Sequence, residues 1–211
     1  MGLSSVLTDP AVPLVADAST VINLIATGSA ADILSALPNR VVVVDHVPAE
    51  LETGRPRGRL ACDGLKALVG GGMIEIVALP DSAAAHYENL VIGAAAETLD
   101  DGEAATIAYA LAVTASPLID ERKATRLCAE RFPHLRVACT VDVLVHPEVQ
   151  QRLGLEVLRE SVFRALQDAQ MGVLPHHLDW IVEVIGRERA ALCPSLPQRV
   201  RSAASAPDLQ R

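Results

Sequence analysis

Four consecutive valines, Val41 to Val44, constrain the fold of this 211-residue chain more than any other stretch. A β-branched run with no polar alternation is typical of a strand that is covered on both faces, as in a parallel sheet wrapped by helices. Hydrophobic residues make up 50% of the chain and aromatic residues only 2%, so Val, Leu, Ile and Ala must build the core. We therefore expect an α/β fold.

The order of the predicted elements agrees with this expectation. Apolar strands alternate with helical patterns as far as residue 140, and parallel βαβ units explain such an order. The expected strands are 14–16, 41–44, 74–78, 117–119 and 136–139. Beyond residue 147 only helical patterns follow, at about 148–170 and 175–190. From Cys193 the chain is rich in Pro, Ser, Ala and Arg, which indicates an extended or disordered tail.

Carboxylates follow two of the expected strands. Asp17 ends the first strand, and Asp120 and Glu121 end the fourth. Ligands of an open parallel sheet bind at the carboxyl ends of its strands, where the strand order reverses. If the two strands are neighbours there, these acids meet in one cleft. Asp17 has an alternative role as the cap of the following helix, although Ser19 and Thr20 could serve as caps too.

Two further acids lie on apolar helical faces. Glu103 shares its face with Thr106, Ile107 and Ala110, which suggests that this face borders a polar pocket. Glu50 follows Val47 in a similar but weaker pattern. Several carboxylates without His or Cys partners suit hard cations such as Mg²⁺ or Mn²⁺. Crowded carboxylates should have raised pKa values, so the cation should bind more tightly as the pH rises.

Four blocks of sequence resemble the acidic blocks of PIN-domain nucleases, and are most similar to VapC-like toxin relatives with a Gly-Glu-Ala third block. These blocks are Val15-Ala16-Asp17-Ala18-Ser19, Val47-Pro48-Ala49-Glu50-Leu51, Gly102-Glu103-Ala104-Ala105-Thr106-Ile107-Ala108 and Leu118-Ile119-Asp120-Glu121-Arg122-Lys123-Ala124. The resemblance covers residues 14 to about 145. It implies a three-layer α/β/α fold with a five-stranded parallel sheet and additional C-terminal helices.

The resemblance also implies an activity and a set of site residues. The activity would be that of a Mg²⁺- or Mn²⁺-dependent endoribonuclease, often inhibited by an antitoxin protein. The catalytic acids would be Asp17, Glu50, Glu103 and Asp120. Metal ligands would come from Asp17, Glu103 and either Asp120 or Glu121, with Ser19 supporting Asp17. Asp142 stands where glycine is common in this branch, so it is either an additional acid at the rim or a turn residue.

The boundaries that we expect are a leader over 1–13, a nuclease domain over 14–147, a helical extension over 148–190 and a flexible tail over 191–211. The helices after residue 147 could close a homodimer or receive an antitoxin segment. We expect a cytoplasmic protein without a membrane segment, since neither a secretory signal nor a long apolar stretch is visible.

The net charge of -8 argues against general polyanion binding. A local basic lip around the acids could still hold RNA phosphates, and a solvated basic loop is the alternative. The candidates for this lip are Arg55, Arg57, Arg59, Arg122, Lys123 and Arg126. We expect His176 and His177 at the surface, and the four cysteines reduced and mostly in the core, without a ligand cluster.

Two other functions remain open. One is a catalytically silent module that keeps the PIN-like fold as a binding or regulatory unit. The other is a haloacid-dehalogenase-like phosphatase, which also places an Asp after its first strand. That chemistry needs a second acid two residues later, where this chain has Ser19.

Overall fold

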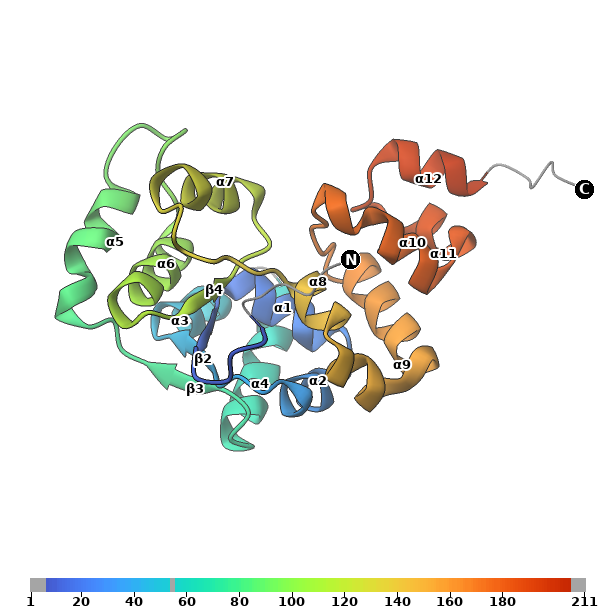
Figure 1. The fold of residues 1–211 in the computed structure, drawn as a ribbon, viewed down its shortest axis with the longest axis horizontal. Helices are drawn as coiled ribbons and strands as arrows, with labels where there is room; N and C mark the ends of the chain where they lie inside the picture. Colours follow the sequence, from blue (N-terminus) through green and yellow to red (C-terminus); the bar gives the residue numbers. More distant parts are fainter. Residues whose placement is uncertain (1–6, 54–55, 206–211) are drawn as a thin grey trace, which may run out of the picture.

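A parallel sheet of four strands forms the centre of the computed structural model (Figure 1). The structure describes residues 7–53 and 56–205, with the side chains of 53–59 and 203–205 left undescribed. The strand order is β3-β2-β1-β4, and every pair is parallel. The strands are β1 (Leu14–Ala16), β2 (Val41–Val44), β3 (Glu75–Val77) and β4 (Ser116–Leu118). The expected α/β fold with a parallel sheet flanked by helices is confirmed.

Helices connect the strands and continue after the last one. The α-helices are α1 (Ala18–Ala26), α2 (Ala30–Ala36), α3 (His46–Thr53), α4 (Pro56–Gly70), α5 (Ala84–Val91), α6 (Asp101–Val113), α7 (Arg122–Arg131), α8 (Thr140–Val145), α9 (Pro147–Gln167), α10 (Leu178–Ile185), α11 (Arg187–Leu192) and α12 (Gln198–Ser205). Two 3-10 helices, η1 (Asp81–Ala83) and η2 (Pro175–His177), precede α5 and α10. Figure 1 shows α5 to α7 on one side of the sheet and α9 to α12 on the other.

The prediction of a fifth strand at 136–139 was wrong. Only Ala138 pairs with the sheet, as a parallel bridge to Leu118. Its carbonyl accepts the Ile119 N–H at 2.8 Å, and its own N–H donates to the Pro117 carbonyl at 3.0 Å. Arg136 is exposed, and the chain turns into α8 directly after Cys139. Pairing therefore lasts for a single residue.

Apolar packing on both faces of the sheet explains the valine run. Val41 and Val43 pack into a cluster that includes residues of α1, α4, α8 and α9. Val42 and Val44 face the other way, into a cluster with Tyr109 of α6. All four valines are buried, as the absence of polar alternation predicted.

The helices after residue 147 share the core with the sheet. Leu166 of α9 and Ile181 of α10 are fully buried in the same cluster as Leu14 of β1. Cys193 and Leu196 also belong to this cluster, and α12 follows them. Residues 191–205 are thus largely helical, with Cys193 and Leu196 buried, where we expected an extended tail. No helix in the described part of the chain is both long enough and apolar enough to cross a bilayer.

Candidate active site

Asp17 lies at the carboxyl end of β1 and is 2% exposed. Its Oδ1 atom accepts the backbone N–H of Thr20 at 2.7 Å, so Asp17 is the N-cap of α1. The Ser19 hydroxyl lies 3.0 and 2.8 Å from the two carboxylate oxygens and donates to them. Capping orients this carboxylate, and a capping role is therefore compatible with a role as metal ligand.

Asp120 follows β4, which pairs directly with β1. Its side chain is buried, and three donors contact it. Oδ1 accepts the Thr140 N–H at 2.8 Å, while Oδ2 accepts the Asn23 amide at 2.6 Å and the Thr140 hydroxyl. Sequence reasoning missed Asn23 and Thr140 as partners. A polar Asn among the apolar residues of α1 was the signal that could have identified the first.

Glu103 lies in the first turn of α6 and is partly buried. Its backbone N–H donates to Asp100 Oδ1 at 2.9 Å, so Asp100 caps this helix. Burial raises the pKa of the Glu103 carboxyl to about 8, with further contributions from the negative charges of Asp100, Asp17 and Glu121. The side chain of Glu103 is therefore close enough to Asp17 and Glu121 for their charges to repel.

The two buried aspartates are also poor acids. Burial raises the pKa of Asp17 to about 7, and the charge of Asp120 adds to this effect. Burial raises the pKa of Asp120 as well, against the opposing effect of its hydrogen bonds to Thr140 and Asn23. The charge of Asp120 thus acts on Asp17, and that of Asp17 acts on Glu103; we call these three residues the acidic cluster.

Glu50 is placed beside the acidic cluster and not in its centre. It is exposed on α3, and its carboxylate fills the space where Gly102 has no Cβ. A cavity of about 420 Å³ is lined by Glu50 and by Asp100, Asp101 and His46 among others. Partial burial and the charges of Asp100 and Asp101 raise the pKa of Glu50. Glu50 therefore borders the amino end of α6 at Gly102, the residue before Glu103.

Glu121 lies at the rim of the acidic cluster. It is exposed and caps α7, where its Oε1 atom accepts the Lys123 N–H at 3.4 Å. Between the two candidates for the fourth acid, Asp120 is the buried one whose charge raises the pKa of Asp17. Glu121 acts on Glu103 instead.

The donor set of the acidic cluster consists of carboxylate oxygens, which is the set that Mg²⁺ and Mn²⁺ prefer. Among the described residues, these carboxylates do not form a group whose ligand atoms all lie within 4.8 Å of one another. Mg²⁺ commonly binds through only one or two carboxylates and keeps several waters. The chemistry of the residues therefore fits such a cation without requiring all three to bind directly.

The expected basic lip is only partly present in the described residues. Arg122 is exposed and lines a cavity of about 350 Å³ together with Asp120 and Glu121. Lys123 and Arg126 instead hold the loop before α6, because Lys123 Nζ donates to the Ala95 carbonyl at 2.6 Å and Arg126 to that of Ala96 at 3.3 Å. The side chains of Arg55, Arg57 and Arg59 lie outside the described residues.

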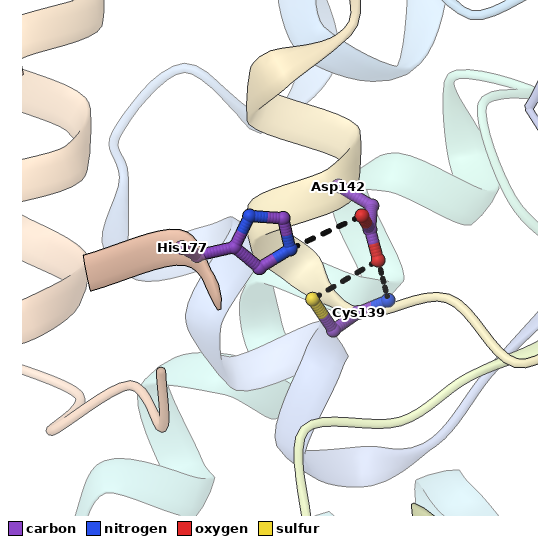
Figure 2. A group of neighbouring side chains, drawn as sticks. All are labelled: Cys139, Asp142 and His177. Carbon is purple, nitrogen blue, oxygen red and sulfur yellow. Dashed lines mark hydrogen bonds and ion pairs between the residues drawn. The ribbon is translucent and has the colours of Figure 1, made fainter. Parts of the chain in front are cut away.

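Asp142 points toward a second group of side chains (Figure 2). Its carboxylate accepts the Cys139 N–H at 2.9 Å and lies 3.1 Å from His177 Nε2. Burial tends to raise the pKa of Asp142, but hydrogen bonds from His177 and Cys139 outweigh it and hold the pKa below its usual range. The expectation that His177 is at the surface was wrong, since it is buried, whereas His176 is exposed. The expectation that no cysteine has a ligand cluster was also wrong, since Cys139 lies beside Asp142 and His177.

Comparison with known proteins supplies one match. A family model described as a PIN domain matches residues 13–186 of the chain. This range includes the sheet, the acidic cluster and the helices as far as the end of α10. No curated protein and no solved structure matches the chain.

Proposed function

Because the chain belongs to the PIN-domain family, we propose that it is a metal-dependent endoribonuclease that acts through the acidic cluster. PIN domains are generally nucleases, so hydrolysis of a nucleic-acid phosphodiester is the activity expected of the fold. The proposal adds three points: Mg²⁺ or Mn²⁺ as the cofactor, RNA as the substrate, and Asp17, Glu103 and Asp120 with Glu50 as the functional acids.

The observation that carries this proposal is the burial of mutually repelling carboxylates. Asp17 and Asp120 are 2% and 8% exposed, and the pKa of Asp17 is raised to about 7. Buried charges are costly unless they are paired or coordinate a metal. A fold that needed only a helix cap at Asp17 could use a neutral residue such as Ser at that position. A divalent cation would offset the repulsion and give the carboxylates a function.

The surrounding residues hold these acids in place. Ser19 and the Thr20 N–H fix the carboxylate of Asp17, while Thr140 and Asn23 fix that of Asp120. When bound there, a divalent cation supplies Lewis-acid polarisation of the phosphodiester and a more acidic water molecule. Glu103, with a pKa of about 8, can hold or release a proton near neutral pH at its carboxylate.

Recognition of the RNA would depend on its backbone. Aromatic residues make up only 2% of the chain, which leaves few platforms for base stacking. Arg122 lines the same cavity as Asp120 and Glu121, and we propose that it binds a phosphate of the RNA.

Two observations favour a second candidate, a catalytically silent PIN-like binding module. Three hydrogen bonds already occupy the two oxygens of Asp120, and the acidic cluster is spread wider than 4.8 Å. A module of this kind would bind a partner through the same surface and would not need a metal.

The test is cleavage of end-labelled RNA by the purified chain in Mg²⁺, in Mn²⁺ and in excess EDTA. We expect cleavage only with the cation, and we expect Asp17→Asn and Glu103→Gln to abolish it. Asp32→Asn is the matched control, because Asp32 is an exposed acid paired with Arg152. Undiminished cleavage by Asp17→Asn would overturn the assignment of the acids. Failure of the unsubstituted chain to cleave RNA in either cation would favour the binding module.

A further inference from the structure

We propose that Cys139, Asp142 and His177 form a second metal site, which would bind Zn²⁺ or a similarly thiophilic divalent cation. We call these three residues the Cys-Asp-His group. They lie outside the acidic cluster, and the inference does not rest on the proposed nuclease function. It rests on two kinds of observation, namely geometry and ligand chemistry.

The geometry is that of a preformed site. One ligand atom from each residue lies within 4.8 Å of the other two, and this is the only such group of His, Cys, Asp and Glu in the described part of the chain. Cys139 Sγ is 3.2 Å from one oxygen of Asp142, and His177 Nε2 is 3.1 Å from the other (Figure 2). With Zn–S near 2.3 Å and Zn–N or Zn–O near 2.0 Å, tetrahedral ligand atoms are roughly 3.3–3.6 Å apart. The two contacts to Asp142 are therefore within about 0.5 Å of this spacing, and the thiol and imidazole ligand atoms are no more than 4.8 Å apart.

The ligand types select a different cation from that of the acidic cluster. Zn²⁺ is bound by thiolate, imidazole and carboxylate, whereas Mg²⁺ prefers oxygen ligands alone. Three protein ligands leave the fourth tetrahedral position to water or to another ligand. The Asp142 side chain is 16% exposed, compared with 5% for that of His177, so the opening of the site lies on the Asp142 side.

A purely hydrogen-bonded network is the competing interpretation. The Cys139 thiol donates to Asp142, and His177 Nε2 lies within hydrogen-bonding distance of the same carboxylate. The buried Nδ1 atom of His177 has no hydrogen-bond partner among the described residues, and this holds with or without an ion on Nε2. On metal binding, the thiol would release its proton to solvent, and the ring would carry its proton on Nδ1 instead of Nε2.

A nucleophilic cysteine does not explain the group. Such a cysteine needs a neighbouring base that takes its proton, or an environment that lowers its pKa. Cys139 donates instead to a carboxylate, and burial with the charges of Asp142 and Asp120 raises the pKa of its thiol. A bound cation would instead favour the thiolate of Cys139, because coordination deprotonates a thiol outright.

The position of the group gives the ion a structural role. Cys139 and Asp142 form the capping box of α8, and His177 ends η2, so the ion would join segments that are 35 residues apart in the sequence. Thr140, the residue after Cys139, donates to Asp120 of the acidic cluster. An ion at the group would therefore fix the start of α8, and through it the position of Asp120.

The test is a Co²⁺ titration of the full chain after removal of metals, in the presence of excess Mg²⁺. Thiolate coordination to Co²⁺ gives a charge-transfer absorption band that oxygen ligands cannot produce. We expect this band to saturate at one equivalent and to disappear when Zn²⁺ is added. Cys193→Ser is the matched control, because Cys193 is also buried and donates to a backbone carbonyl. This control should keep the band.

Cys139→Ser and His177→Gln should lose the band, and circular dichroism checks that they are folded. If Cys139→Ser does not fold, His177→Gln decides, because it retains the thiol. Zn²⁺ should also raise the urea midpoint of the unsubstituted chain and not that of His177→Gln. Absence of the band in the unsubstituted chain, or a full band in His177→Gln, would overturn the proposal and leave a hydrogen-bonded network only. Neither measurement involves RNA, so this failure is distinct from failure of the nuclease proposal.

Discussion

In the absence of metal, Asp17→Asn should be more stable than the unsubstituted chain, and this difference should grow as the pH rises. The same substitution should remove activity. The folded-state pKa of Asp17 is about 7, above an ordinary value of 3.8, mainly because the residue is buried. When folding raises the pKa of a carboxyl group, its protonated form contributes to the free energy of unfolding. This contribution is complete below the unfolded-state pKa and is lost as the pH rises through the folded-state pKa. Asparagine does not ionise, and its side-chain oxygen can still accept the Thr20 N–H.

The magnitude follows from the two pKa values. At about 1.4 kcal/mol per pKa unit, ionisation of Asp17 lowers the free energy of unfolding by about 4 kcal/mol at pH 8 and by about 2 kcal/mol at pH 5. The hydrogen bond from Ser19 that is weakened in the variant costs about 1 kcal/mol at either pH. The stability of Asp17→Asn relative to the unsubstituted chain should therefore increase by about 2–3 kcal/mol from pH 5 to pH 8.

The assay is urea denaturation in EDTA at the two pH values, followed by circular dichroism, with Asp32→Asn as the control. The control should show no comparable pH-dependent gain, because exposed ion pairs contribute about 0–1 kcal/mol. Excess Mn²⁺ should reverse the order, since a cation that binds the folded state stabilises only the chain with an intact site. A difference between Asp17→Asn and the unsubstituted chain that is the same at pH 5 and pH 8 would refute this reasoning.

Three other predictions concern the same region. The affinity for Mn²⁺, measured by calorimetry, should rise between pH 6 and pH 8, because protonated carboxyls must lose their protons to bind the ion. The pKa values are about 7 for Asp17 and about 8 for Glu103. The affinity should therefore increase about 10-fold if Asp17 alone binds the ion and about 500-fold if both residues do. A flat profile would contradict it. Thr140→Val removes the hydroxyl donor to Asp120 and should lower the free energy of unfolding by about 1–3 kcal/mol in urea titrations; an unchanged urea midpoint would speak against this bond. Arg122→Ala should weaken RNA binding in a filter assay without changing the affinity for Mn²⁺, whereas equal loss of both would place Arg122 at the metal and not at the phosphate.

The fold could be predicted largely from local sequence. The valine run, the Asp100 cap of α6 and the start of α7 at Arg122 each depend on residues close together in the chain. The fifth strand could not be judged this way. Its pairing competes with the capping box of α8, which fixes Cys139 through a side chain three residues later.

The sequence predicted that the acids of the candidate site follow strands one and four, but not that these strands are neighbours. The α/β pattern left open whether β1 and β4 are neighbours, and their pairing in the structure brings the segments of Asp17 and Asp120 together. Asn23 contacts Asp120 across 97 residues of sequence, and His177 contacts Asp142 across 35. Contacts between residues so far apart in the chain leave no periodic pattern in a single sequence, so neither pair could be predicted from it. The roles of the individual acids remain predictions.

Anomalous scattering from a crystal grown or soaked in Mn²⁺ tests the central claim most directly. The claim is that the acidic cluster holds a divalent cation. We predict a peak coordinated by a carboxylate oxygen of Asp17 and at least one oxygen of Glu103 or Asp120, and we predict that it is absent in Asp17→Asn. A crystal saturated with Mn²⁺ that shows no peak beside these carboxylates would contradict the account.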